Sequence, residues 1–206
     1  MQTEDLIRVL FALAAGYFLG GIPFGIIVPK LIGGPDPRTV GSGRTGGANV
    51  SRAVGYRWAL VSGLLDVAKA SLAVLLVMAV GGGIVPQVVA ALAAILGHSR
   101  SPYIGLHGGR GVAPATGGAL LIAPLILAVI FPVFVVVILI TRISSLGSLS
   151  GSLIGGIVMI VATAVVPLAP VYYLYGVGVP GLIWLFHLDN IQRLLAGEER
   201  RVLPSR

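Results

Sequence analysis

Glycine, arginine and hydroxyl side chains gather in one polar segment of the chain, GSGRTGG at residues 41–47. Four of its seven positions are glycine, with Ser42, Arg44 and Thr45 between them. Glycine lets successive backbone N–H groups point at one anion, hydroxyls add hydrogen bonds, and arginine binds phosphate through two N–H groups. The composition predicts a phosphate cradle, although a flexible connector would also be glycine-rich. A nucleotide-hydrolysing P-loop is excluded, because the Gly-Lys-Ser/Thr ending and the preceding strand are missing.

A second polar segment, GHSRSPYIGLHGGRGVAPATGG, repeats these ingredients from Gly97 onward. It contains His98 and then the run from His107 to Gly111, which leads directly into an apolar stretch. A glycine-rich turn at the start of a helix places free N–H groups and the positive end of the helix dipole on an anion. Two such segments predict a substrate, or a pair of substrates, that carries phosphate.

Further polar and ionisable residues occur inside one apolar run and directly after the last one. Asp66 and Lys69 are one helical turn apart inside such a run, where a charged group is costly and indicates either a functional site or an internal ion pair. His187, Asn190 and Arg193 follow the last run and begin an amphipathic tail. A histidine at a membrane exit is often only an interfacial residue, and a role beside phosphate is equally consistent with its neighbours.

The composition indicates that the elements which position these residues are embedded in a membrane. The 206 residues are 56% hydrophobic and 10% charged, with a mean hydropathy of +1.01, whereas soluble domains are about a quarter charged. We therefore expect an all-α integral membrane protein. The chain has no cysteine, which excludes disulfides, thiolate metal sites and cysteine nucleophiles. Its start, MQTEDLIRVL, lacks the basic region of a signal peptide and is predicted to begin the first span.

The apolar runs predict about seven crossings, since a helix needs about 20 residues to span the bilayer. The two longest runs are divided at Pro124 and at Pro167 and Pro170, because proline ends helices, and the segment just after residue 111 is short enough to be re-entrant. Glycines four residues apart predict helix contacts. The runs are 7–28, 58–80, 84–97, 112–141 and 153–186, and the glycine pairs are Gly16/Gly20, Gly21/Gly25 and Gly151/Gly155.

The basic residues predict the orientation of these spans. Of the 14 lysines and arginines, all except Arg8 and Lys69 fall in segments that this topology places on one face. Cytoplasmic loops are enriched in Lys and Arg, so we expect the N-terminus outside and the C-terminus in the cytoplasm. The cytoplasmic parts of a single membrane-embedded domain, 1–206, are then the loops 29–57, 98–111 and 142–152 and the amphipathic tail 187–206. The net charge of +7 fits this topology and anionic headgroups, and nucleic acid is not an expected partner, because no aromatic-basic platform is present.

With these motifs in place, the chain resembles the bacterial acyl-phosphate:glycerol-3-phosphate acyltransferase family (PlsY) along nearly its whole length. The order and spacing of the shared motifs are specific, whereas any one motif would be weak. They are GGIPFGII in the first span, D-x-R at Asp36, GSG-x-x-G-x-x-N-V-x-R from Gly41 to Arg52, L-L-D-x-x-K at Asp66 and Lys69, L-G-H at His98, G-G-R-G-V-A from Gly108, a serine-rich third loop, and H-x-x-N-I-x-R-L-L-x-G from His187.

The resemblance implies transfer of a fatty acyl group from acyl phosphate to the 1-hydroxyl of glycerol 3-phosphate, which yields lysophosphatidic acid and phosphate. The expected place is the cytoplasmic face of the bacterial inner membrane, and the expected partners are both substrates, membrane lipid and the enzyme that makes acyl phosphate. Because the donor is already activated, no metal and no cofactor are expected. A His-x4-Asp mechanism is excluded, since none of the 3 histidines has an aspartate at the required position.

The family motifs also imply roles for individual residues. Arg52 and Arg110 are expected to hold phosphate. Ser42 and Asn190 are expected to orient the substrates, and His187 to assist proton transfer, for which the substrate's own phosphate is the alternative. The expected catalytic residues are therefore Ser42, Arg52, His187 and Asn190; the expected phosphate-binding residues are Gly41, Ser42, Gly43, Arg44, Asn49, Arg52, His107, Gly108, Gly109, Arg110 and Gly111; and the expected supporting residues are Asp66, Lys69, His98 and Arg193.

Departures from the family pattern fall in both phosphate motifs. Arg44 replaces the first asparagine, and His107 and Arg110 replace two lysines. Because a neutral imidazole carries no fixed charge, we expect Arg44 to compensate for the charge lost at His107. The alternative functions are a non-catalytic or altered-substrate paralogue, and a small transporter that binds a phospho-compound. Transport is the less favoured, since no internal repeat is present.

Overall fold

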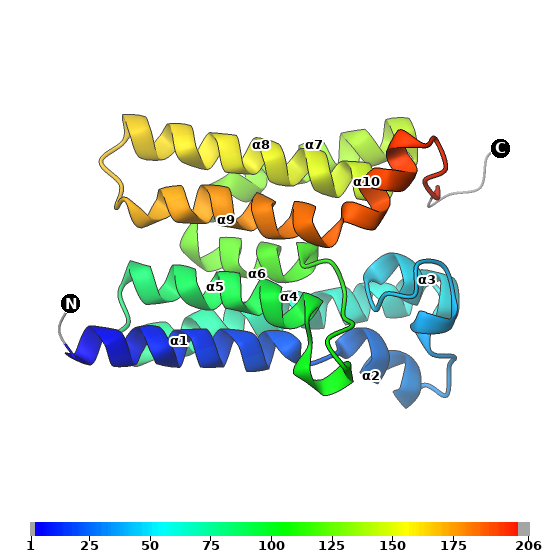
Figure 1. Ribbon diagram of the computed structural model, residues 1–206, viewed down its shortest axis with the longest axis horizontal. Helices are drawn as coiled ribbons and strands as arrows, with labels where there is room; N and C mark the ends of the chain where they lie inside the picture. Colours follow the sequence, from blue (N-terminus) through cyan, green and yellow to red (C-terminus); the bar gives the residue numbers. More distant parts are fainter. Residues whose placement is uncertain (1–2, 202–206) are drawn as a thin grey trace. The chain divides into compact units, whose positions relative to one another are not determined.

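The computed structural model describes residues 3–201, and every regular element in that part of the chain is a helix (Figure 1), which confirms the expected all-α fold. The elements, with η marking short 3-10 helices, are α1 (Thr3–Gly21), α2 (Phe24–Leu31), η1 (Pro37–Thr39), α3 (Gly47–Val54), α4 (Tyr56–Ala79), α5 (Ile84–Ser99), η2 (Pro102–Ile104), α6 (Val112–Ile122), α7 (Pro124–Thr141), α8 (Ser144–Val165), α9 (Val171–Phe186) and α10 (Leu188–Leu195).

The helices form two compact units, Met1–Ile122 with α1 to α6 and Ala123–Arg206 with α7 to α10. In the first unit α1 packs along α5, and α4 contacts α1, α5 and α6. In the second unit α8 contacts both α7 and α9. The boundary falls between Ile122 and Ala123, next to Pro124, where the long apolar run was predicted to divide. A single membrane-embedded domain over residues 1–206 stays a prediction.

Small residues let α1 and α5 lie side by side in the first unit (Figure 1). A Cβ added at Gly16 would lie 2.8 Å from the Cβ of Ala93, and one at Gly20 would lie 2.5 Å from the Cα of Ala94. Without those side chains the two backbones approach closely enough to gain continuous van der Waals contact. The predicted helix contact at Gly16 and Gly20 is confirmed.

The first apolar run is interrupted at Ile22 and Pro23, between α1 and α2. Proline cannot donate the backbone hydrogen bond that a continuous helix needs there, so nearby carbonyls take partners from elsewhere. The Ser101 hydroxyl donates to the Gly21 carbonyl at 2.6 Å, and Lys69 Nζ donates to the Ile22 carbonyl at 2.6 Å. Side chains distant in the sequence therefore donate hydrogen bonds to the carbonyls at the break between α1 and α2.

Glycines also form the contacts of α8 in the second unit. A Cβ at Gly155 would lie 2.6 Å from Ile130 Cγ1 of α7, and one at Gly151 would lie 3.4 Å from Ile130 Cγ2. On the other side, Gly156 lies against the carbonyl of Gly176 in α9. The contact predicted for Gly151 and Gly155 is confirmed.

Five helical segments in the described part of the chain are long and apolar enough to cross a membrane, and α9 with α10, bent by 66°, is a sixth candidate. The five are Thr3–Leu31, Tyr56–Ala79, Ile84–Ile104, Pro124–Thr141 and Ser144–Val165. The helix α6 is apolar but has only 11 residues. The predicted divisions are confirmed, because α7 begins at Pro124 and because Pro167 and Pro170 lie in the break between the end of α8 and the start of α9.

The expected loop 142–152 is wrong for most of its length, because α8 already begins at Ser144. Serine was taken as a loop signal, yet the Ser148 hydroxyl donates to the Ser144 carbonyl at 3.0 Å, and Ser152 bonds to the Leu149 carbonyl at 3.0 Å. Such back-bonding satisfies the hydroxyls inside a helix. The expected loop 29–57 is likewise partly helical, since it includes the end of α2, η1 and α3.

Candidate active site

The first glycine-rich segment forms a tight loop between η1 and α3. Gly41 and Gly43 have φ angles of +58° and +69°, the left-handed region that glycine occupies without steric cost. A Cβ at Gly41 would also overlap the side chain of Asn49. Gly46 is the N-cap residue of α3 and provides no side-chain cap, so the first N–H groups of α3 face this loop.

Asn49, which is 2% exposed, holds this loop with its side-chain amide. Its Nδ2 donates to the carbonyls of Val40 at 3.1 Å and Arg44 at 2.9 Å, and to the Ser42 hydroxyl at 3.1 Å. Its Oδ1 accepts from the Ser42 N–H at 3.3 Å. The buried amide therefore fixes the path of the whole 40–44 segment against α3.

Arg52 extends from α3 toward the same amide. Its Nη1 donates to Asn49 Oδ1 at 3.0 Å and to the Ala48 carbonyl at 3.4 Å, while the residue as a whole is exposed. The structure thus brings together Ser42 and Arg52, two of the expected catalytic residues, on either side of Asn49. Arg44 lies half-buried in the same loop.

The short helix α2 supports the loop from behind. A Cβ at Gly25 would overlap the carbonyl of Thr45, and Thr45 itself is 2% exposed. The glycine lets the backbone of α2 approach the loop directly. This contact gives a physical reason for the glycine in the GGIPFGII motif, which was predicted only as a helix contact.

The second glycine-rich segment folds back onto the end of α5. The Gly108 N–H donates to the Ser99 carbonyl at 3.2 Å, and the Gly109 N–H donates to the His98 carbonyl at 3.1 Å. Both glycines are buried, and a Cβ on either would overlap His98. Gly111 has a φ of +85° and directly precedes α6. The predicted arrangement of a glycine turn at a helix start is confirmed.

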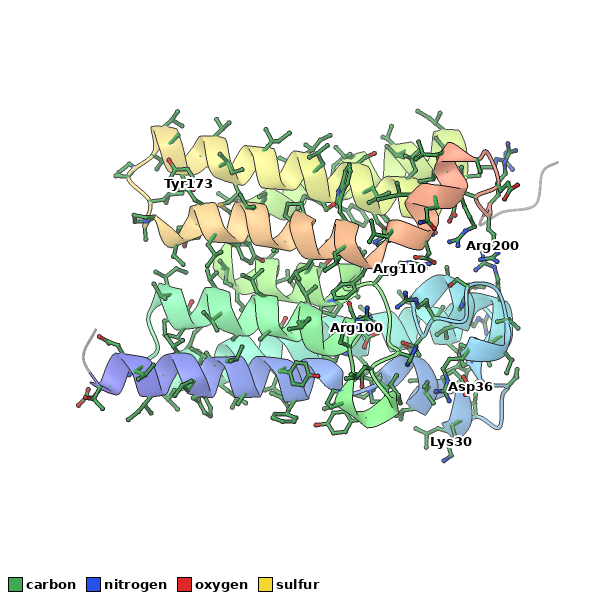
Figure 2. All side chains as sticks on the ribbon, in the orientation of Figure 1. Lys30, Asp36, Arg100, Arg110, Tyr173 and Arg200 are labelled. Carbon is green, nitrogen blue, oxygen red and sulfur yellow. The ribbon has the colours of Figure 1, made fainter. Side chains whose placement is uncertain are left out.

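Basic residues surround this end of the first unit. Figure 2 shows Lys30, Asp36, Arg100 and Arg110 at the same end of the unit. Arg110 is half-buried within the second loop. His107 is exposed, and its Nδ1 lies 2.5 Å from the Gly105 carbonyl.

Asp36 is the acidic exception among these basic residues. Its carboxylate accepts from Arg38 Nη2 at 2.7 Å and from Arg38 Nε at 3.0 Å. These hydrogen bonds from the Arg38 side chain lower the pKa of Asp36 below its usual 3.8. The pair cancels its own charge, so the D-x-R motif acts on the turn at η1.

Asp66, Lys69 and His98 meet in the interior of the first unit, beneath the second loop. Lys69 Nζ lies 2.6 Å from Asp66 Oδ1 and 3.0 Å from His98 Nδ1. The two residues from α4 therefore form the internal ion pair that the sequence left open, and the structure adds His98 to it.

The remaining expected residues lie in the second unit, at the junction of α9 and α10. His187 and Asn190 are 2% and 3% exposed, and His187 Nδ1 is 2.7 Å from the Ile183 carbonyl. Asn190 Nδ2 donates to Glu199 Oε1 at 2.6 Å, and Arg193 Nε donates to Glu199 Oε2 at 2.8 Å. Asn190 and Arg193 thus belong to one polar group around Glu199, while the His187 ring bonds to the backbone of α9.

Glu199 and Ser145 complete that polar group and were not predicted. Glu199 Oε1 also accepts from the Ser145 hydroxyl at 3.0 Å, which ties the tail to the start of α8. The Glu199 side chain is only 7% exposed although it stands in the polar run GEER. No local sequence signal marks it, because α10 carries one acidic and one basic residue and the partners of Glu199 come from different elements.

These features define the class of protein: an all-helical membrane protein with two glycine- and arginine-rich polar loops in its first unit. The chain matches the family described as Glycerol-3-phosphate acyltransferase over residues 10–197. It is 38% identical to a glycerol-3-phosphate acyltransferase of Anaeromyxobacter dehalogenans (strain 2CP-1), over 98% of this chain and 100% of the relative. It is 39% identical to that of Synechococcus sp. (strain JA-3-3Ab), over 95% of this chain and 94% of the relative.

Solved structures give the same result. The crystal structure of PlsY (YgiH), an integral membrane glycerol 3-phosphate acyltransferase, in its glycerol 3-phosphate form matches with a TM-score of 0.82 and 33% identity, over 96% of this chain and 95% of that one. Its lysophosphatidic acid form matches with a TM-score of 0.81 and 32% identity over the same shares. The chain therefore belongs to the glycerol-3-phosphate acyltransferase family, and the resemblance seen in the sequence motifs is confirmed.

Proposed function

We propose that this acyltransferase moves a fatty acyl group from acyl phosphate to the 1-hydroxyl of glycerol 3-phosphate. The hydroxyl oxygen attacks the acyl carbon, a new ester C–O bond forms, the bond from that carbon to the phosphate oxygen breaks, and inorganic phosphate leaves. The hydroxyl proton passes to a base. The observation that carries the proposal is the pair of glycine-rich loops at one end of the first unit, one for each phosphate-bearing substrate. The glycerol 3-phosphate and lysophosphatidic acid forms of PlsY agree with it.

The residue roles follow from the contacts within each loop. Arg52 and Arg110 bind phosphate, because an arginine can place two N–H groups on one phosphate. Ser42 orients a substrate from a loop that Asn49 keeps rigid. The backbone of Gly108, Gly109 and Gly111 lets phosphate approach the start of α6, where the helix dipole favours negative charge. Asn49 contributes by shaping the loop, since its amide already has protein partners.

His187 is proposed to accept the hydroxyl proton, and Asn190 to orient the substrate beside it. The Nδ1–H of His187 donates to the Ile183 carbonyl, which places the basic lone pair on Nε2. That tautomer is the one a general base needs. Acyl phosphate is a mixed anhydride and already activated, so positioning and charge neutralisation are sufficient and no metal or cofactor is required.

Arg44 is proposed to supply the positive charge that His107 does not. Its backbone is fixed by Asn49 within the first loop, where the family pattern has an uncharged asparagine. Arg44→Glu should raise the KM for glycerol 3-phosphate at least tenfold. Arg57→Glu, an equally large change of charge at an exposed position in α4, is the control and should change KM less than threefold. An unchanged KM in Arg44→Glu would rule out this role.

The proposed topology has about seven crossings, with the N-terminus outside and the active site at the cytoplasmic face of the bacterial inner membrane. At about 1.5 Å per residue α6 is only about 17 Å long and completes its crossing as a short span before α7 returns. Because the chain lacks cysteine, a single introduced cysteine can report on which side of the membrane its loop lies. Gly83→Cys should react with an impermeant maleimide in intact cells, and Arg57→Cys only after permeabilisation; the reverse pattern would invert the topology.

A product assay tests the reaction. Purified protein in lipid receives palmitoyl phosphate and labelled glycerol 3-phosphate, with Ser42→Ala alongside. Lysophosphatidic acid formed by the intact protein, and reduced at least a hundredfold in Ser42→Ala, is the expected result. Binding of glycerol 3-phosphate without any product would contradict the proposal, and would instead support a relative with a different donor or acceptor.

A further inference from the structure

Three buried titratable side chains lie beneath the second loop and take no part in the proposed chemistry. Asp66 and Lys69 of α4 are each 4% exposed, and His98 of α5 is 7% exposed. The His98 Nδ1 lies 3.5 Å from Asp66 Oδ1, and Lys69 Nζ contacts both of these atoms. Buried charges are costly even when paired, and apolar residues often replace such a pair without loss of stability. Stability alone therefore gives a weak reason for this cluster.

Lys69 connects the cluster to the break between α1 and α2. Its Nζ donates to the Ile22 carbonyl at 2.6 Å as well as contacting Asp66 and His98. The contact with Asp66 is an ion pair, and the contact with His98 joins the ammonium group to the imidazole ring. One side chain thus links the break between α1 and α2 to α4 and α5.

His98 connects the cluster to the second loop. Its carbonyl accepts the Gly109 N–H at 3.1 Å, and the neighbouring Ser99 carbonyl accepts the Gly108 N–H. Its ring lies directly under Gly109: a Cβ there would overlap Nε2 and lie 2.9 Å from Cδ2. The position of the imidazole therefore sets the height and tilt of the backbone at Gly108 and Gly109.

We propose that Asp66, Lys69 and His98 are positioning residues for the glycerol 3-phosphate site. Lys69, oriented by Asp66 and anchored on Ile22, holds the His98 ring, and the ring holds the loop in the conformation that presents its backbone to phosphate. None of the three touches substrate. The inference rests on the proposed role of the second loop in binding glycerol 3-phosphate.

A charge-neutral double variant separates positioning from simple stability. Asp66→Asn combined with Lys69→Met removes both charges together, so it avoids the unpaired buried charge that either single change would leave. The thermal midpoint should stay within a few degrees of wild type, while the KM for glycerol 3-phosphate rises at least tenfold. The KM for palmitoyl phosphate should change less than threefold. Ser71→Ala is the matched control, because it removes a hydrogen bond from α4 to the Gly117 carbonyl outside the cluster and should leave both KM values unchanged.

A size exchange tests the contact between His98 and the loop. Gly109→Ala and His98→Ala should each raise the KM for glycerol 3-phosphate, because one pushes the loop away and the other removes its support. In the double variant the added methyl group takes space that the imidazole has left, so the combined effect should be at least fivefold smaller than the product of the two single effects. Strictly multiplicative effects would show that the ring does not position the loop.

The outcomes distinguish the inference from the proposed function. Labelled glycerol 3-phosphate binding to wild type is measured without a donor, and turnover is measured separately. If wild type binds and turns over glycerol 3-phosphate and the neutral double variant keeps the wild-type KM, only the positioning role is wrong. If wild type neither binds nor turns over glycerol 3-phosphate, the proposed function is wrong and the positioning role is overturned with it.

Discussion

The side chain of Asn49 provides the sharpest test of how the first loop works. Asn49→Ala removes the amide that bonds to the Val40 and Arg44 carbonyls and to Arg52. A lost hydrogen bond between neutral groups costs about 1 kcal/mol, and a buried group left without a partner costs about 1–3 kcal/mol. With two carbonyls affected, the ordered loop should be destabilised by about 2–3 kcal/mol, which corresponds to a decrease of about 30- to 150-fold in kcat/KM.

The assay measures initial rates of lysophosphatidic acid formation over a range of both substrates, together with thermal unfolding followed by tryptophan fluorescence. The effect should appear in kcat/KM, with a shift of the unfolding midpoint of only a few degrees, because the loop lies at one end of the unit. Ser51→Ala, a small change on the same helix outside the hydrogen-bond network of the loop, is the control and should stay within twofold of wild type.

Asn49→Asp sharpens the test by keeping the shape of the side chain. The carboxylate still accepts from the Ser42 N–H and from Arg52, but it presents oxygen to the Val40 and Arg44 carbonyls, where the wild type presents N–H donors. We expect a loss at least as large as that of Asn49→Ala. An Asn49→Asp variant with wild-type kcat/KM would refute the argument that the Nδ2 bonds fix the loop.

Three further predictions follow from other contacts. Gly41→Ala should lower kcat/KM at least tenfold, because it forces a left-handed φ on alanine and places its Cβ on Asn49; Gly46→Ala, which meets open space, should change it less than threefold. The Asp36 carboxyl carbon should titrate in NMR spectra with a midpoint below 3.8, and Arg38→Gln should return it toward 3.8. Because the pKa of Asp36 is lower in the folded than in the unfolded chain, the Asp36–Arg38 pair stabilises the fold at pH values above the unfolded pKa, and this stabilisation is lost as the pH falls through the folded pKa. A titration midpoint above 3.8 would contradict the hydrogen bonds assigned to Asp36. Glu199→Gln should lower the thermal midpoint by several degrees, because Arg193 loses a charged acceptor; an unchanged midpoint would show that the Glu199 bonds do not stabilise the second unit.

The parts of the fold that were predictable from sequence are those with a local cause. Pro124 begins α7, and Pro167 and Pro170 lie in the break between α8 and α9, although Pro132 and Pro180 lie inside helices without ending them. Glycines four residues apart bring helices together in both units. Residues 144–152 were misread because serine favours both loops and helix starts. The choice between them depends on which backbone carbonyl accepts each hydroxyl, which only the structure reveals.

The candidate site also has parts that were predictable from local sequence and parts that were not. The two glycine-rich loops were recognisable because their glycines, arginines and hydroxyls are adjacent in the chain. The spacing of Asp66 and Lys69 indicated an internal pair, but neither its contact with His98 nor the role of Glu199 could be predicted, because both depend on partners from different elements. Lys69 contacts a residue 47 positions away, and Ser145 contacts one 54 positions away. Such contacts follow from packing and have no local sequence signal.

The break between α1 and α2 has a consequence for how the protein is made. Its carbonyls at Gly21 and Ile22 accept hydrogen bonds from Ser101 and Lys69, which lie 80 and 47 residues further along the chain. Lipid offers no water to carbonyl groups, so both side chains must be present before these hydrogen bonds can form. An amino-terminal fragment that stops before residue 101 therefore lacks the hydroxyl that bonds to the Gly21 carbonyl at the break.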